Sequence, residues 1–289
     1  MPLRSWMFVP GDSEVKLSKV MALGADVVIV DLEDAVAPEA KSRAREMTAG
    51  WLAEQRRGGS QLWVRINPLD GDLWRQDLSA VMPSCPDGIV VPKASGPDQL
   101  ETLASELCDL EQREGIATGS TLILPLVSET PRAALTVADY ATRPIARLLG
   151  LTWGAEDLSA AIGASRKRDE AGEWTDLFRM VRAATLLTAH AAGISAIDTL
   201  HADFRDLDRL GQVARASYLD GFAGMLAIHP SQVAVINTAF SPSSVEREWA
   251  QRIVDAFAAQ PGIGTLQLDG KMIDQPHLEQ ARRLLRRAG

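Results

Sequence analysis

Residues 27–38 read VVIVDLEDAVAP, an apolar, β-branched run that passes directly into Asp31, Glu33 and Asp34. A short apolar run bounded by turn signals is typical of a buried strand. A buried carboxylate is costly unless it is paired or hydrogen-bonded, so three of them at the end of such a strand require an explanation. Either these groups leave the core where the strand ends, or they hold something there.

The same pattern recurs along the chain, with amphipathic helical stretches between the apolar runs. Most repeats are about thirty residues long, the length of one βα unit. Eight strands alternating with helices over roughly 240 residues predict a (β/α)8 TIM barrel of the α/β class, with a doubly wound open sheet as the alternative. The eight predicted strands are Trp6–Pro10, Val27–Asp34, Leu62–Asn67, Gly88–Lys93, Leu122–Glu129, Leu148–Gly154, Ser195–Thr199 and Met225–His229.

A barrel accounts for the charged strand ends. The carboxyl ends of all eight strands meet at one mouth, where the active sites of such barrels lie. One charged strand end means little, but a series of them on one face indicates a site. The polar residues at or just after these ends are Glu33, Asp34, Arg65, Asn67, Lys93, Glu129, Asp157, Asp198 and His229.

The composition of the chain argues against several classes of protein. No segment is apolar over the length of a membrane span, and the N-terminus lacks the apolar region of a signal peptide. A net charge of -8 argues against nucleic acid or an anionic membrane as a partner. The two cysteines, Cys85 and Cys108, stand in no metal-binding or redox spacing, which indicates a reduced, cytoplasmic protein.

The chain beyond the eighth strand is longer than one barrel helix requires. We expect residues 1–241 to form the catalytic barrel and residues 242–289 to form a small appended element. It should contain a helix at Val245–Ala258, a Gly-rich turn and a basic amphipathic helix at Pro276–Arg287. This element would serve as a lid or an intersubunit arm, or alternatively pack against the outside of the barrel.

The predicted mouth suits a hard metal ion. The histidines show no zinc-binding spacing, and dinucleotide-binding and Walker motifs are absent from the sequence. Carboxylates with room for water and a substrate oxygen suit Mg²⁺, with Mn²⁺ as a substitute. The predicted ligand pair is Glu129, in LVSETP, and Asp157, in TWGAEDLS, with Glu156 as an alternative to Asp157. Both carboxylates could instead be N-caps of the helices that follow them.

Two basic residues at strand ends have a functional and a structural interpretation. Arg65, in VRINP, suits a substrate carboxylate or an enolate-like oxygen, with an ion pair to Glu33 or Asp34 as the alternative. Lys93, in VVPKAS, is a candidate Schiff-base lysine. A solvated lysine, or one paired with Glu129, is the alternative.

Ten motifs in register carry a family resemblance from Arg4 to Pro276. They are RSWMFVPGD, GADVVIVDLEDAV, LWVRINP, GIVVPKA, LPLVSET, WGAEDLSA, AIDTLHADFRD, LAIHPSQV, FSPS and DGKMIDQP. Together they resemble the citrate lyase beta subunit-like family, within the wider group of HpcH/HpaI aldolases and malyl-CoA lyases.

This resemblance implies a TIM barrel that cleaves or forms a C–C bond in a 3-hydroxyacyl-CoA thioester such as citryl-, malyl- or citramalyl-CoA, the other product or substrate being an α-keto acid. It implies Glu129 and Asp157 as Mg²⁺ ligands and Arg65 as the residue that holds the keto-acid or enolate oxygen. Glu33 and Asp34 would surround the waters of the metal.

The IDQP motif resembles the C-terminal lid signature of the family. It implies that Asp274 is a general acid/base delivered into the mouth of a neighbouring subunit, and hence a homotrimer or a dimer of trimers. Met225, in GFAGMLAIHP, stands where the family has a lysine. CoA binding would change if that lysine serves the CoA phosphates, and would not if the position only packs at the strand start. We expect His229 to be structural, with a contact to CoA as the alternative.

Other functions remain compatible with the same mouth. A malyl-CoA-type thioesterase would hydrolyse the thioester without changing a C–C bond. A CoA-independent hydroxy-keto-acid aldolase is less consistent, because the family members of that type use a histidine near strand two and VDLEDAVAP contains none. A beta subunit acting only within a multi-subunit citrate lyase is the further alternative. The set Arg65, Glu129 and Asp157 argues against an inactive binding module.

Overall fold

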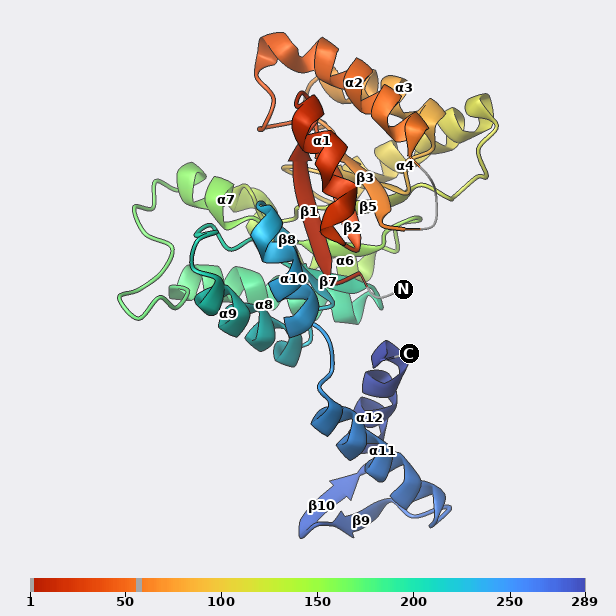
Figure 1. Ribbon diagram of the computed structural model, residues 1–289, viewed down its shortest axis with the longest axis vertical. Helices are drawn as coiled ribbons and strands as arrows, with labels where there is room; N and C mark the ends of the chain where they lie inside the picture. Colours follow the sequence, from red (N-terminus) through yellow and green to blue (C-terminus); the bar gives the residue numbers. More distant parts are fainter. Residues whose placement is uncertain (1–2, 56–58, 289) are drawn as a thin grey trace.

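Eight parallel strands form the central sheet in the computed structural model, which describes residues 3–55 and 59–288 (Figure 1). Neighbouring strands follow the order β5-β4-β3-β2-β1-β8-β7-β6. The two end strands meet through parallel bridges at Ile123–Leu148 and Leu126–Thr152, so the sheet closes into the predicted barrel and the open-sheet alternative is wrong. The strands are β1 Ser5–Pro10, β2 Val27–Asp31, β3 Gln61–Arg65, β4 Gly88–Val91, β5 Leu122–Pro125, β6 Gly150–Thr152, β7 Ser195–Asp198 and β8 Gly224–Ala227.

The junction between β5 and β6 differs from the other strand pairs. These two strands are joined by isolated bridges, whereas the other neighbours share continuous ladders. We call this junction the β5–β6 seam.

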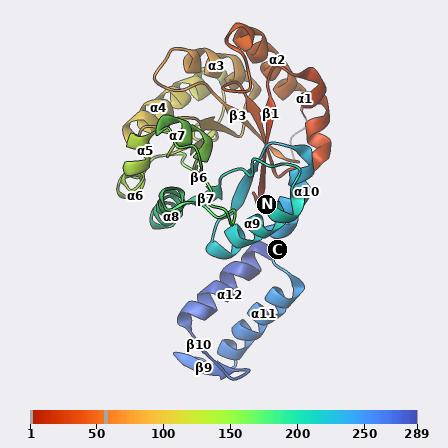
Figure 2. The same cartoon turned by 90° about the vertical axis from the view of Figure 1, so that its left-hand side faces the viewer.

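Helices surround the sheet on its outer side (Figure 2). None of the helices among the described residues is long and apolar enough to cross a membrane. The helices of this layer are α1 Glu14–Val20, α2 Lys41–Glu54, α3 Leu73–Val81, α4 Pro97–Glu114, α5 Pro131–Leu135, α6 Asp139–Thr142, α7 Ala155–Ala161, α8 Asp176–Ala191, α9 Leu207–Asp220 and α10 Pro230–Ala239. Short 3-10 turns lie at Met21–Leu23, Pro38–Ala40 and Met82–Ser84.

Buried side chains fill the interior of the barrel. Trp6 and Trp63 pack edge to face with their ring centroids 5.0 Å apart. Gly88 makes room for them, because a Cβ at this position would lie 2.5 Å from the Trp63 ring. The remaining buried members of this interior cluster are Val27, Ile29, Val90, Leu124, Leu126, Ile197 and Leu226.

Most of the strands end before the polar residues that were predicted to belong to them. For example, β2 ends at Asp31, so Glu33 and Asp34 lie in the following loop. The Asp31 carboxylate accepts hydrogen bonds from the backbone N–H groups of Glu33 (2.9 Å) and Ala35 (3.1 Å). This turn bends the chain out of the sheet, so the carboxylates follow the strand and are not part of it.

The chain after α10 forms an arm that projects from the barrel (Figures 1 and 2). It consists of α11 Ser244–Ala258, β9 Thr265–Leu268, β10 Lys271–Asp274 and α12 Gln275–Ala288. The predicted Gly-rich turn is therefore wrong in detail, because β9 and β10 pair as an antiparallel hairpin. Asp269 and Gly270 at its tip both have positive φ, which is the backbone of a tight two-residue hairpin turn.

The arm has an apolar cluster of its own. The buried residues of this cluster are Ala250, Ile253, Phe257, Leu266, Ile273, Leu278 and Ala281. The arrow of β1 points away from the arm in Figure 1, so the arm extends from the side where the strands begin. The mouth of the barrel lies on the opposite side.

Candidate active site

Strand register brings Asp31 and Arg65 together at the mouth. They are direct neighbours in the β2–β3 ladder. Arg65 donates from Nε (2.7 Å) and Nη2 (2.6 Å) to the two oxygens of Asp31, and the Phe8 ring lies 4.9 Å from the guanidinium carbon. Burial disfavours the charged guanidinium, but the hydrogen bonds and charge of Asp31 outweigh it and raise the pKa of Arg65. Arg65 is therefore a fixed cation with N–H groups to spare.

Glu33 joins this pair to a second cation. Its Oε2 lies 2.9 Å from Arg65 Nη1, and its Oε1 accepts a short hydrogen bond from Lys93 Nζ. The ion pair between Arg65 and Glu33 was one alternative for this arginine, and it is present. The pair with Asp34 is wrong, because Asp34 is largely exposed and lies 3.6 Å from the Lys93 ammonium.

Lys41 holds the loop that carries Glu33 through hydrogen bonds to its backbone. Lys41 Nζ donates to the backbone carbonyls of Leu32 (2.7 Å) and Glu33 (2.6 Å). Leu32 O also accepts from the side-chain amide of Asn67 (3.1 Å), and Asn67 is bound in turn by the fully buried Asp77. The carboxylate of Glu33 is thus positioned by a loop whose backbone has little freedom.

Lys93 contacts four carboxylates, and its backbone conformation makes this possible. Its φ of 51° is in the left-handed region, which few residues other than glycine adopt. The backbone N–H donates to Glu129 Oε2 (2.5 Å), while the ammonium lies against Glu33, Asp34 (3.6 Å) and Asp157 (3.5 Å). The side-chain pair with Glu129 is therefore wrong, because it is the backbone of Lys93 that binds Glu129.

The ion pairs of Lys93 argue against a Schiff base. Burial disfavours the ammonium form, but the hydrogen bond and charge of Glu33 outweigh it and raise the pKa of Lys93. A protonated amine is not a nucleophile, and lysines that form Schiff bases need a lowered pKa.

Glu129 is almost completely buried, and no Lys, Arg or His side chain in the described part of the chain forms a hydrogen bond or ion pair with it. Burial raises its pKa to about 8, the charges of Asp157 and Glu33 add to the rise, and the backbone N–H of Lys93 opposes it. Gly154 leaves space for this side chain, since a Cβ there would lie 2.8 Å from Glu129 Cγ. The N-cap interpretation is wrong, because Thr130 caps α5 through its own hydroxyl.

Asp157 faces the same cluster from the first turn of α7. The N-cap of α7 is Gly154, so the N-cap interpretation is wrong for Asp157 as well. The neighbouring Glu156 is exposed and pairs with Lys167. Of the two acidic residues in this turn, it is Asp157 that points toward Lys93.

These residues fit Mg²⁺ better than a softer metal. Among the described residues, there is no group of three or more His, Cys, Asp or Glu side chains arranged to hold a metal. Mg²⁺ is commonly bound by one or two carboxylates, with water and substrate oxygens completing its six ligands. Glu129 and Asp157 offer such a pair, and the raised pKa of Glu129 signals that a cation would relieve its burial.

Three of the polar strand-end residues have structural roles. Asn67 binds Asp77, and Asp198 accepts from Trp153 Nε1 (2.7 Å), Arg182 and Ser217. His229 caps α10 by accepting from the backbone of Ser231, as expected for a structural residue.

Met225, the departure from the family pattern, is almost fully buried in the core at the start of β8. Its surroundings support the alternative in which the position only packs.

Asp274 lies far from the mouth of its own barrel. Both views place the β9–β10 hairpin at the end of the arm farthest from the barrel (Figures 1 and 2). Its carboxylate makes a short hydrogen bond with His277 Nδ1, which lowers the pKa of Asp274. In this conformation, Asp274 cannot take part in chemistry at its own mouth.

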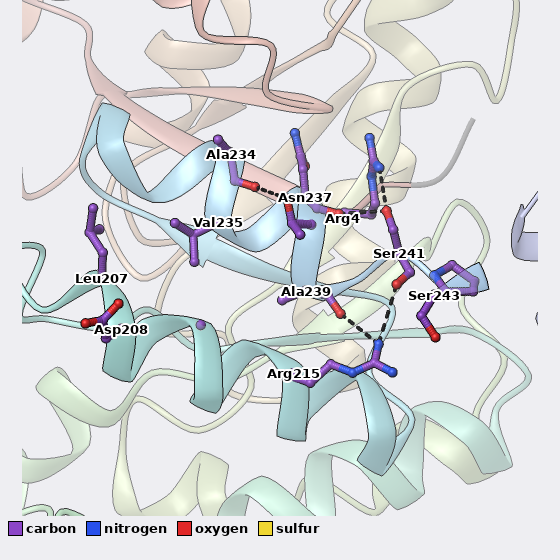
Figure 3. A pocket seen from close by; sticks show the side chains of 13 residues that line it. Arg4, Leu207, Asp208, Arg215, Ala234, Val235, Asn237, Ala239, Ser241 and Ser243 are labelled. Carbon is purple, nitrogen blue, oxygen red and sulfur yellow. Dashed lines mark hydrogen bonds between the residues drawn. The ribbon is translucent and has the colours of Figure 1, made fainter. Parts of the chain in front are cut away.

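A groove of about 980 Å³ lies between α9, α10 and the start of the arm (Figure 3). The two arginines that line this groove already bind other groups of the chain. Arg215 donates to the carbonyls of Ala239 and Ser241 and pairs with Glu246 of α11, while Arg4 pairs with Asp26. These contacts tie the arm to the barrel, and the groove contains none of the residues described at the mouth.

Sequence reasoning missed two residues of this cluster. Asp31 was included among the unexplained carboxylates but not as the partner of Arg65. The signal was available, since both residues close apolar strands at equivalent positions in consecutive repeats. Gly154 has no signal in a single sequence, because its role depends on the side chain that packs against it.

Comparison with known proteins identifies the family of the chain. Residues 4–230 match the model of the HpcH/HpaI aldolase/citrate lyase family. The chain is 34% identical over 284 residues to a citrate lyase subunit beta-like protein of Mycobacterium tuberculosis, covering 98% of this chain and 95% of the relative. It is also 34% identical over 289 residues to a (3S)-malyl-CoA thioesterase of Cereibacter sphaeroides, covering 99% and 95%.

A solved structure shows the same likeness in three dimensions. The crystal structure of the protein CitE from Mycobacterium tuberculosis in complex with magnesium, acetoacetate and coenzyme A has a TM-score of 0.81 at 33% identity, covering 100% of this chain and 98% of that one. The residues matched by the family model span all eight strands of the barrel, and the relatives extend over almost the whole chain. The chain therefore belongs to the HpcH/HpaI aldolase/citrate lyase family.

Proposed function

We propose that this chain is a Mg²⁺-dependent carbon–carbon lyase that cleaves a 3-hydroxyacyl-CoA, such as citramalyl-, malyl- or citryl-CoA, into an acyl-CoA and an α-keto acid. The observation that carries the proposal is the pairing of a buried, cation-deficient Glu129 with Asp157 beside the fixed cation Arg65. The related CitE, solved in complex with magnesium, acetoacetate and coenzyme A, supports a metal ion, a keto acid and CoA as the molecules bound here.

Glu129 and Asp157 would hold the metal, and Glu33 and Asp34 would order the waters around it. When bound, Mg²⁺ would polarise the hydroxyl and carboxylate oxygens of the acyl group and favour loss of the hydroxyl proton. The remaining work falls to side chains of the protein.

Arg65 would stabilise the developing negative charge. A guanidinium has five N–H donors, of which Asp31 takes two, and the carboxylate of Glu33 lies 2.9 Å from Nη1. The others can bind a keto-acid carboxylate or an enolate oxygen. Because Asp31 holds the group rigidly, little reorganisation is needed as charge develops, which is the main advantage of a preorganised site.

Asp274 of a neighbouring subunit would exchange the proton at carbon. The hydroxyl proton would pass to a water ordered by Glu33 and Asp34, the C–C bond would then break to give the keto acid and a thioester enolate, and the carboxylic acid form of Asp274 would protonate the enolate carbon. In condensation, the carboxylate would remove that proton. The place of Asp274 at the far end of the arm favours this arrangement, in a homotrimer or a dimer of trimers.

The second candidate is a malyl-CoA-type thioesterase, which the (3S)-malyl-CoA thioesterase relatives favour. Here the carboxylate of Asp274 would take a proton from a water that attacks the thioester carbonyl, and the C–S bond would break to release the free acid and CoA.

One experiment separates these functions. Purified protein with Mg²⁺ is mixed with acetyl- or propionyl-CoA and with glyoxylate, pyruvate or oxaloacetate in pairs, and mass spectrometry follows the CoA species. A new hydroxyacyl-CoA that disappears with EDTA and in Asp274→Ala supports the lyase and identifies the substrate pair.

The matched control is Asp269→Ala, which removes an aspartate from the tip of the same hairpin. Incubation of the enzyme with (3S)-malyl-CoA, the thioester named for the relatives, then tests the thioesterase, which would release free CoA. A complete absence of turnover, with Mg²⁺ still bound, would contradict both and favour a beta subunit that acts only within a multi-subunit citrate lyase.

A further inference from the structure

Lys93 contacts the same carboxylates that the proposed function assigns to Mg²⁺ and its waters. Its ammonium lies 3.5 Å from Asp157 and against Glu33, and its backbone N–H binds Glu129. No other described residue makes contact in this way with both of the predicted ligands. An ammonium ion and a divalent cation would therefore draw on one set of negative charges.

The charge of the cluster explains why such a cation is needed. Five carboxylates, Asp31, Glu33, Asp34, Glu129 and Asp157, lie around the side chains of Arg65 and Lys93, and the third nearby cation, Lys41, is bound to the backbone carbonyls of Leu32 and Glu33. Asp31 already occupies much of Arg65 through two hydrogen bonds. Lys93 is consequently the cation that Asp34 and Asp157 share, and it is the second counter-charge of Glu33 beside Arg65.

The backbone of Lys93 indicates that its position is maintained at some cost. A φ of 51° disfavours lysine, and glycine or asparagine would adopt it more readily. The conformation turns the N–H toward Glu129 and the side chain toward the other carboxylates. A lysine kept in this conformation by neighbouring contacts suggests that the side chain has a function.

We propose that Lys93 is an internal counter-cation that competes with Mg²⁺ for Asp157 and Glu33, and so sets the metal affinity of the mouth. This inference rests on the proposed function, because it needs a Mg²⁺ site at Glu129 and Asp157. Lys93 holds the carboxylates together before the metal arrives, and loading requires the ammonium to yield Asp157. Lys93 thus weakens metal binding while it stabilises the metal-free mouth.

The test measures Mg²⁺ binding by isothermal titration calorimetry and thermal unfolding in EDTA, without any assay of activity. The full chain is compared with Lys93→Met, which keeps the length of the side chain and the same backbone demand but removes the charge. We expect the Kd for Mg²⁺ to fall at least roughly tenfold, because a unit charge a few ångströms from a divalent ion is removed. The same variant should unfold at a lower temperature in EDTA.

Two controls accompany this variant. Lys93→Arg retains the charge and should bind Mg²⁺ within about threefold of the unmodified chain, whereas Lys16→Met makes the same charge change on an exposed face of α1 and should change neither measurement. The proposal predicts that Lys93→Met binds Mg²⁺ more tightly but is less stable in EDTA. If Lys93 had only a structural role, its replacement would weaken Mg²⁺ binding and lower the stability together.

Unchanged or weaker Mg²⁺ binding by a folded Lys93→Met would overturn the competition. The absence of Mg²⁺ binding by the unmodified chain would instead overturn the metal site of the proposed function, and the competition with it. The two failures are thus distinguishable.

Discussion

Two buried glutamates at opposite ends of the barrel have opposite surroundings. Glu111, at the end of α4, accepts two hydrogen bonds from Arg147 (2.6 and 2.7 Å) and two from the backbone N–H groups of Gly119 and Thr121. Burial alone would raise its pKa, but these donors outweigh burial and lower the pKa of Glu111 to about 2. Glu129 has one backbone donor, and its pKa rises to about 8.

The difference separates a structural carboxylate from one that we propose to bind a ligand. At the base of the barrel, where β5 and β6 begin, Glu111 receives its hydrogen-bond donors and its counter-charge from the chain itself. At the mouth, the glutamate is buried among other acids and its charge is left uncompensated. Perturbed titration of this kind is typical of sites that act on a ligand. A residue type and its burial therefore do not reveal the role, whereas the donors around it do.

The largest expected effect comes from making the same substitution at both ends. Glu111→Gln leaves the buried Arg147 guanidinium without a charged partner, and we expect a loss of about 3–5 kcal/mol in the free energy of unfolding. Glu129→Gln resembles the protonated form of Glu129, so in metal-free buffer at pH 8 it should leave the stability unchanged or higher. Urea unfolding in EDTA measures both variants. Equal losses at the two positions would refute the contrast.

A smaller effect is expected from filling the space beside Glu129. In Gly154→Ala, the added Cβ would lie 2.8 Å from Glu129 Cγ, so the side chain must shift. Overpacking of this kind costs about 1–3 kcal/mol, and Mg²⁺ binding should weaken as Glu129 moves. Gly50→Ala is the control, since a Cβ there meets nothing within 4 Å. Isothermal titration calorimetry and urea unfolding measure both variants. Undiminished Mg²⁺ binding by Gly154→Ala would show that Glu129 is not a ligand of the metal.

The pH dependence of stability should have opposite signs at the two ends, with slopes of at most about 1.4 kcal/mol per pH unit for one proton. Because the folded pKa of Glu111 is depressed, its contribution is present above the ordinary pKa of a glutamate and is lost as the pH falls toward 2. Because that of Glu129 is raised, its contribution is present below the ordinary pKa and is lost as the pH rises toward 8.

Differences between the unmodified chain and each glutamine variant isolate these slopes. In EDTA, the deficit of Glu111→Gln should shrink from pH 4 downward, within the limits of a chain that remains folded. The relative stability of Glu129→Gln should rise between about pH 5 and pH 8. Urea unfolding at a series of pH values provides the measurement. A flat difference for Glu129→Gln would mean that its carboxyl titrates normally.

The barrel and the mouth were predictable because both follow from local patterns. Apolar runs that recur at the length of one βα unit predict the strands. Charged residues at the carboxyl ends of these strands predict which end of the barrel carries the site. The pairing of Asp31 with Arg65 depends on the register of β2 and β3, and the contacts of Lys93 depend on a left-handed backbone. The pairing had a signal in the equivalent positions of the two residues in consecutive repeats, whereas the left-handed backbone of Lys93 had none in the composition of its segment.

The β9–β10 hairpin shows a signal that was present but not used. The segment TLQLDGKMID places Asp-Gly between two short runs, and that dipeptide favours a tight hairpin turn. The glycines nearby made the whole segment resemble a loop. The role proposed for Asp274 came from a resemblance, and the structure adds that the residue lies far from its own mouth.

The β5–β6 seam has a mechanical consequence. Glu129 follows β5 and Asp157 begins the helix after β6, so a single ion held by both would act as a clasp across the junction that lacks a continuous ladder. Opening of the barrel at this point and release of the ion would then be one event. Metal binding should slow hydrogen exchange at the seam amides of Val127 and Leu149, which bond to Thr152 and Ile123. The place where the barrel is least tightly closed by its backbone would thus be closed by its cofactor.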